Sequence, residues 1–128
     1  MTMMGLKLFT KEFKCGSMGK LVRDNIPTFI KSSGKTPVFH IEEDETKKYN
    51  YLLNKIVEEA KEVKNSTNED DLLHEIADVY EVILSILKFK GHTFSDMQEI
   101  AKAKRTIRGS FDKFIILDRV KEKKVIEN

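Results

Sequence analysis

The stretch YLLNKIVEEAKEV at residues 51–63 and the stretch DLLHEIADVYEVILSILKF at residues 71–89 decide the fold. Apolar residues recur in both at intervals of three and four, which is the period of a helix with a buried face. The residues Asn-Ser-Thr-Asn at 65–68 interrupt this pattern, and Asn68 can cap the second helix. We therefore expect two consecutive antiparallel helices, the second ended by Gly91.

Acidic residues stand where these two helices are otherwise apolar. Glu59 borders the apolar face of the first helix, and Glu62 lies next to it. Glu75 falls inside the apolar face of the second helix, and Asp78 lies at its edge. A charge on a buried face is costly unless something pairs with it. Only Glu59 has a cation one helical turn away, namely Lys55, so local salt bridges do not explain the other three acids.

The spacing of these acids favours a bound metal ion. Glu59 and Glu62 are three residues apart, as are Glu75 and Asp78, so each pair lies on one helical face. Two antiparallel helices could direct all four carboxylates at one point. A tertiary Lys or Arg could pair with one such acid, but a cluster suggests a divalent ion. Oxygen ligands suit Mg²⁺, for which Mn²⁺ can substitute, whereas structural zinc prefers His or Cys.

Three motifs carry a resemblance to a known superfamily. The residues Glu-Glu-Ala-Lys-Glu at 58–62 and Glu-Ile-Ala-Asp at 75–78 resemble the E-E-x-x-E … E-x-x-D signature of the all-α NTP pyrophosphohydrolases. That superfamily includes MazG-like proteins, dimeric dUTPases and phosphoribosyl-ATP pyrophosphohydrolases. The stretches KLVRDNIP at 20–27 and KRTIRGSF at 104–111 are similar to the opening and closing motifs of one MazG-like branch. Ser110 stands where the closing motif often has a second glycine.

The resemblance implies a fold, an activity and a set of roles. It implies an all-α, MazG-like helical bundle that forms a homodimer or homotetramer. It also implies Mg²⁺-dependent hydrolysis of a nucleoside triphosphate between the α- and β-phosphates, giving a monophosphate and pyrophosphate. By position, the family's metal ligands correspond to Glu59, Glu62, Glu75 and Asp78. Glu58 or Glu62 is the candidate that accepts the proton of the attacking water.

Basic residues near the ends of the domain are candidates for binding the substrate phosphates. Lys104, Arg105 and Arg108 lie at the end of a third predicted helix, where they could equally form a solvated, dipole-stabilised helix end. Lys20 and Arg23 are further candidates of the same kind.

The remaining elements are expected from local signals. A short helix begins near residues 24–27 and ends at residues 32–34, and the third helix begins with a capping box at Ser95 and ends at Gly109. Residues 37–41 and 114–117 are rich in β-branched and aromatic side chains, which predicts extended segments or short strands that could pair as a short peripheral β-hairpin. The expected domain spans residues 20–120, between an extension at 1–19 and a charged tail at 121–128.

Composition excludes several classes of protein. The 128 residues fit one domain, and a net charge of +2 gives no general attraction to nucleic acid. Cys15 is the only cysteine, which excludes an internal disulfide. No apolar run is long enough for a membrane span, so we expect a cytoplasmic protein. The second helix is apolar around most of its circumference, which predicts a homo-oligomer.

Some alternatives stay open. The chain could be a phosphoribosyl-ATP pyrophosphohydrolase of histidine synthesis, or a non-catalytic helical regulator that senses nucleotides. A nucleic-acid-binding domain using Arg105 and Arg108 is disfavoured by the near-neutral charge. Phe39 and Tyr49 could stack on a base, although ordinary core packing is the simpler reading, and His74 is expected at the surface.

Overall fold

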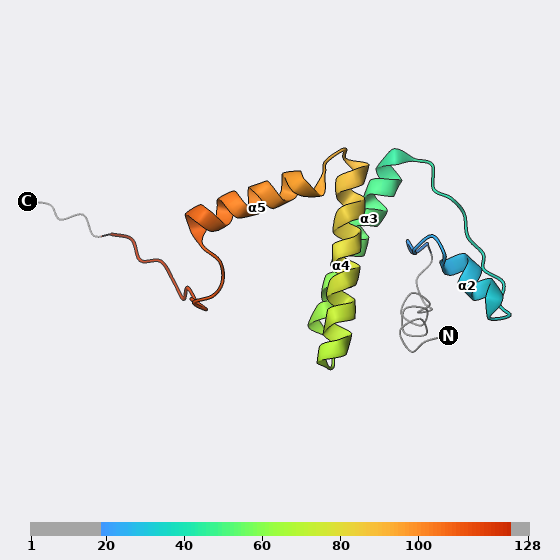
Figure 1. The fold of residues 1–128 in the computed structure, drawn as a ribbon, viewed down its shortest axis with the longest axis horizontal. Coiled ribbons are helices and arrows are strands. Elements are labelled where there is room, and N and C mark those ends of the chain that lie inside the picture. The colour runs from blue at the N-terminus through green and yellow to red at the C-terminus, as the bar shows by residue number, and fades with distance from the viewer. Residues whose placement is uncertain (1–18, 124–128) are drawn as a thin grey trace, which may run out of the picture. The chain divides into compact units, whose positions relative to one another are not determined.

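The computed structural model describes residues 19–123, and the regular secondary structure of this part of the chain consists of helices, without strands (Figure 1). Its helices are α2 (Ile26–Ser32), α3 (Glu45–Lys64), α4 (Glu69–Phe89) and α5 (Phe94–Arg108). The chain forms two compact units, Met1–His92 and Thr93–Asn128. The prediction of an all-α fold is confirmed at this level, and no described helix is both long and apolar enough to cross a membrane.

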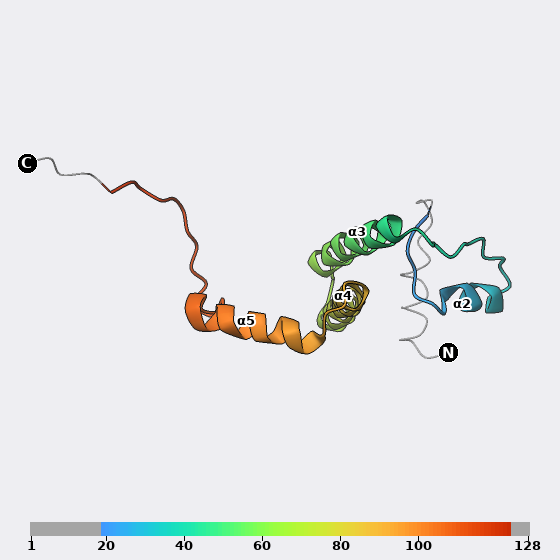
Figure 2. The same cartoon turned by 90° about the horizontal axis from the view of Figure 1, so that it is seen from above.

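The first unit is built around α3 and α4, which lie side by side in both Figure 1 and Figure 2. Only residues 65–68 separate these two long helices, so they form an antiparallel hairpin, as the sequence predicts. Asn68 caps α4, because its side-chain oxygen accepts a hydrogen bond of 2.8 Å from the backbone N–H of Asp71. Asp44 caps α3 in the same way through the N–H of Lys47.

The interior of this unit is unusual in its chemistry. Among the described residues, the buried apolar side chains are Ile26 and Val82. The buried charged side chains are Lys55, Glu59, Glu75 and Asp78. Large apolar side chains on the same two helices remain exposed instead, among them Val57, Leu73, Ile76 and Tyr80. The contact between α3 and α4 therefore contains a charged cluster that ordinary hydrophobic packing does not explain.

The predicted β-hairpin is wrong for the described residues. Residues 37–41 and 114–117 have no regular secondary structure. Val38 is 96% exposed, and Phe114 has a φ of +50°, which a β-strand cannot adopt. A β-branched sequence suits a strand only if another strand pairs with it, and pairing is decided by the tertiary fold.

The start of α5 also differs from the prediction. The capping residue is Thr93, not Ser95: its hydroxyl accepts from the N–H of Asp96, whose carboxylate accepts from the N–H of Thr93. The capping box is thus two residues earlier than the sequence analysis placed it, while the end at Gly109 is as predicted. The extension at 1–19 and the tail at 121–128 lie largely outside the described residues, as does Cys15.

We predict that Thr93→Ala lowers the helix population of α5, whereas Ser95→Ala leaves it nearly unchanged. Losing the capping side chain costs about 1 kcal/mol. Backbone carbon chemical shifts of residues 94–108 in the two variants provide the measurement. Equal losses in both variants, or a larger loss for Ser95→Ala, would contradict the cap assignment.

Candidate metal centre

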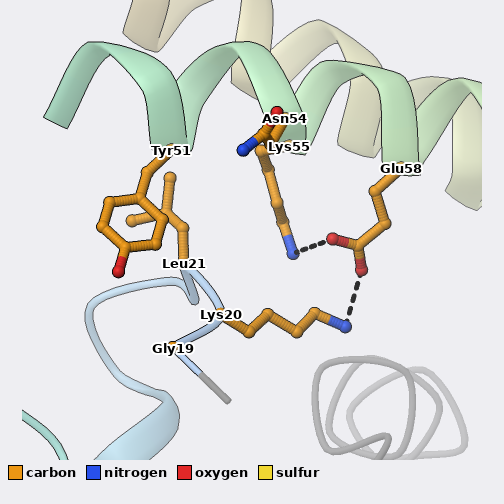
Figure 3. A pocket seen from close by; sticks show the side chains of 7 residues that line it. All are labelled: Gly19, Lys20, Leu21, Tyr51, Asn54, Lys55 and Glu58. Atoms are coloured by element: carbon orange, nitrogen blue, oxygen red, sulfur yellow. Dashed lines mark ion pairs between the residues drawn. The ribbon is translucent and has the colours of Figure 1, made fainter. Parts of the chain in front are cut away.

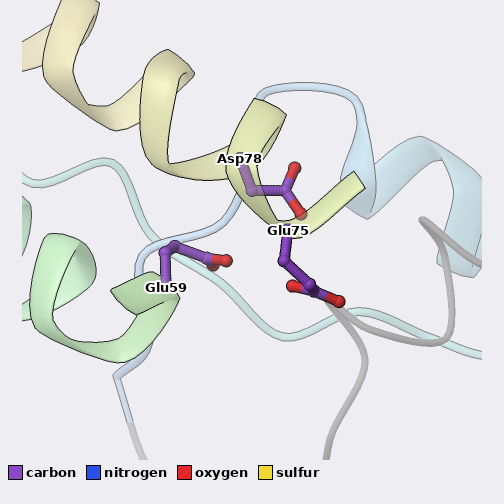
Figure 4. A group of neighbouring side chains, drawn as sticks. All are labelled: Glu59, Glu75 and Asp78. Carbon is purple, nitrogen blue, oxygen red and sulfur yellow. The ribbon is translucent and has the colours of Figure 1, made fainter. Parts of the chain in front are cut away.

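Three carboxylates converge between α3 and α4. Glu59 projects from α3 towards Glu75 and Asp78, which project from α4 (Figure 4). Each residue offers one oxygen atom, and these three atoms all lie within 4.8 Å of one another. The residues are 1%, 5% and 3% exposed, respectively. The spacing of three residues between Glu75 and Asp78 places both on the face of α4 that meets α3.

Burying like charges so close together is costly. At an effective dielectric constant of about 20, two unit charges 4.8 Å apart repel each other by about 3 kcal/mol. Each carboxylate also loses its hydration on burial. Positive charge must therefore lie close to this cluster if the three groups are ionised.

Two cations of the protein lie against the cluster. The Nζ atom of Lys55 is 3.4 Å from Oε1 of Glu59, which confirms the local pairing that the sequence predicts. The Nη2 atom of Arg23 is 2.7 Å from Oδ1 of Asp78, across 55 positions of sequence. Both contacts reduce the repulsion between the acids. The contact of Arg23 with Asp78 is a tertiary ion pair, which the sequence allows as an explanation for one such acid.

A fourth acid, Glu58, lies at the edge of this site between two lysines. Its Oε1 is 2.6 Å from Nζ of Lys20, and its Oε2 is 3.7 Å from Nζ of Lys55 (Figure 3). Burial alone raises the pKa of Glu58, but the hydrogen bond from Lys20 and the charges of both lysines outweigh it. The net result is a pKa below the ordinary value of 4.5. Glu58 is therefore ionised at neutral pH.

The structure thus assigns contacts to most of the predicted residues of the first unit. Lys20 and Arg23, expected to bind phosphate, both contact acids of the site. Glu62 is half-buried one turn after Glu58 and Glu59, and it is not part of the group of three converging acids. Two ligand candidates from α4 and one from α3 therefore come together, and Glu62 stands beside them.

Other residues singled out from the sequence have no described contact with the acidic cluster. Lys104, Arg105 and Arg108 are exposed on α5 in the second unit, and their role in phosphate binding stays a prediction. His74 is half-buried rather than exposed, with Nε2 3.8 Å from Oδ1 of Asp70. Tyr49 stacks on Phe89 with ring centroids 5.9 Å apart, in agreement with the packing role.

The sequence analysis missed a small pocket on the flank of the acids. The pocket has a volume of about 170 Å³ and lies between α3 and the segment that precedes α2 (Figure 3). Its lining residues are Gly19, Lys20, Leu21, Tyr51, Asn54, Lys55 and Glu58. The signal that could have indicated it is the spacing of Tyr51, Lys55 and Glu58, which places them on one helical face.

Gly19 has a backbone conformation that this pocket requires. Its φ is +70°, which favours glycine, and a Cβ atom at this position would lie 3.1 Å from the hydroxyl oxygen of Tyr51. The close approach of the backbone to Tyr51 therefore depends on the absence of a side chain.

Comparison of the chain with models of known protein families, with curated proteins and with solved structures found no match.

We predict that Lys20→Met lowers the free energy of unfolding at neutral pH by about 0.5–1 kcal/mol, as expected for a partly exposed ion pair. Because the folded state lowers the pKa of Glu58, its contribution is complete above about pH 4.5 and is lost as the pH falls through the lower folded pKa. The difference between wild type and variant should therefore shrink on acidification.

Urea unfolding at a series of pH values measures this difference, with Lys31→Met, an exposed lysine on α2, as the control. A difference for Lys20→Met that is independent of pH would show that the lysine acts through packing rather than through the charge of Glu58.

Proposed function

We propose that this protein is a magnesium-dependent nucleoside triphosphate pyrophosphohydrolase. The observation that carries the proposal is the convergence of Glu59, Glu75 and Asp78 within 4.8 Å, buried between two antiparallel helices. The same residues belong to the E-E-x-x-E … E-x-x-D pattern that resembles the all-α pyrophosphohydrolases. The sequence pattern and the geometry thus point to the same side chains.

The donor set fits Mg²⁺. All three converging groups are carboxylates, and hard oxygen ligands are those that Mg²⁺ and Mn²⁺ prefer. The group contains no His or Cys, which a zinc site would favour.

Mg²⁺ bound by these acids would neutralise phosphate oxygens and orient or acidify a water molecule. In the proposed reaction, water adds across the α–β phosphoanhydride, and the products are a nucleoside monophosphate and pyrophosphate. A proton acceptor must take the proton of that water. Glu58 is a poor acceptor, because two lysines lower its pKa. We therefore assign the role of proton acceptor to the half-buried Glu62. We assign to Glu58 the role of positioning Lys20 and Lys55.

The physiological substrate under this proposal is an aberrant nucleotide that is removed from the pool, or alternatively phosphoribosyl-ATP. The exposed apolar side chains of α4, including Leu73, Ile76 and Tyr80, support assembly as a homodimer or homotetramer.

A specific observation favours a second candidate, a non-catalytic regulator that keeps this fold. Arg23 and Lys55 place protein cations against Asp78 and Glu59. Such cations can stabilise buried acids in a protein that binds no metal ion. Metal binding and turnover separate the two candidates.

We predict that Mg²⁺ or Mn²⁺ raises the thermal unfolding temperature of the wild type, and that Glu75→Gln abolishes this increase. Ligand at 100 times its dissociation constant stabilises the folded state by about 2.7 kcal/mol. Glu81→Gln, which changes an exposed glutamate of the same helix, is the matched control and should keep the increase. An equal increase in Glu75→Gln would place the metal elsewhere.

We predict that the wild type with Mg²⁺ releases pyrophosphate from at least one member of a panel of standard, deoxy and modified nucleoside triphosphates and phosphoribosyl-ATP. Glu59→Gln should lower the rate by at least about 100-fold, the upper end of the effect of changing a residue that only supports a metal ligand. Glu81→Gln again serves as the control. Absence of pyrophosphate release from every substrate would contradict the enzyme and favour the regulator.

A further inference from the structure

The pocket beside the acids has the dimensions of part of a nucleotide. Pockets that enclose a whole drug-sized ligand measure roughly 300–1,000 Å³. The pocket at α3 measures about 170 Å³, so it can hold one moiety of a substrate but not all of it.

The charges of the lining do not favour a phosphate group. Lys20 and Lys55 are the cations of the pocket, but Glu58 lies against both of them. Lys55 also lies against Glu59. An entering phosphate would be repelled by the carboxylate of Glu58. The same carboxylate already offsets the positive charges of the two lysines. A neutral moiety meets no such repulsion.

The remaining walls suit a flat, neutral and polar group. Leu21 and the ring of Tyr51 lie together on one side of the pocket (Figure 3). Asn54 adds an amide, which both donates and accepts hydrogen bonds, and the hydroxyl of Tyr51 does the same. An apolar wall next to such groups is the combination that recognises a heterocyclic base by its face and its edge.

The position of the pocket agrees with this assignment. Lys55 precedes Glu59 by four residues on α3, a distance of about 6 Å along the helix axis, and Tyr51 is a further turn away, about 12 Å from Glu59. In a nucleotide the ribose separates the base from the α-phosphate. With a base in the pocket, the carboxylates would therefore lie within reach of the phosphates.

We propose that the pocket formed by Leu21, Tyr51 and Asn54 binds the heterocyclic base of the nucleotide. This inference rests on the proposed function for the identity of the ligand. It makes Tyr51 and Asn54 the residues that determine which base is accepted. It also gives Gly19 a role, because a side chain there would press on the hydroxyl of Tyr51.

Titration with nucleosides tests the pocket without involving the acids, because a nucleoside has no phosphates and needs no metal ion. The probes are adenosine, guanosine, cytidine, uridine and thymidine, added to the full chain in EDTA and followed by amide chemical shifts. We expect at least one nucleoside to shift residues 51–58. Asn54→Ala should weaken its binding by about three- to tenfold, the effect of losing one or two hydrogen bonds.

The matched control is Asn50→Ala, which changes an exposed asparagine one turn earlier on α3 that does not line the pocket. Its affinity should equal that of the wild type. Gly19→Ala supplies a second variant and should weaken binding without affecting α3. If no nucleoside shifts these residues, or if Asn54→Ala and Asn50→Ala bind equally, the inference is wrong.

The outcome is separable from that of the proposed function. Pyrophosphate release without nucleoside binding at residues 51–58 would overturn the base pocket and leave the enzyme intact. Nucleoside binding that Asn54→Ala weakens, without pyrophosphate release from any substrate, would support the pocket and overturn the enzyme.

Discussion

The mutual repulsion between Glu59, Glu75 and Asp78 is the main physical constraint on the rest of the first unit. Three carboxylate charges within 4.8 Å, each on a residue at most 5% exposed, repel one another strongly unless positive charge lies close by. The protein supplies part of that charge from Lys55, on the same helix as Glu59, and from Arg23, in the segment before α2. Charged contacts therefore help to hold that segment against the helical hairpin.

The same electrostatic contacts connect the acids to the neighbouring pocket. Lys55 lies against Glu59 on one side and against Glu58 on the other, and Glu58 in turn holds Lys20 at the wall of the pocket. Lys55 thus contacts both an acid of the cluster and an acid of the pocket. Under the proposed function, this arrangement would couple the binding of metal and nucleotide, because each ligand would alter the charges that the other meets.

The sequence predicts those features of the candidate site that depend on the helical period alone. Acids three residues apart on apolar faces are visible in the printed chain, as is the pairing of Glu59 with Lys55. The contact of Arg23 with Asp78 joins residues 55 positions apart, and no local rule indicates it. Tyr51 and Asn54 were overlooked for a related reason, since the opposite wall of their pocket comes from residues 19–21. The strand prediction failed because exposed β-branched residues found no partner strand among the described residues.

By itself the sequence determined the helices, their approximate ends and the faces on which the acids lie, because these depend on contacts within a few residues. Tertiary structure alone decided which acids meet and which cations accompany them. It brings together Glu59, Glu75 and Asp78, leaves Glu62 beside them, and turns Lys20 and Arg23 towards carboxylates. The reason is physical: helical period fixes the direction of a side chain on its own helix, whereas convergence depends on how two helices and a distant segment pack.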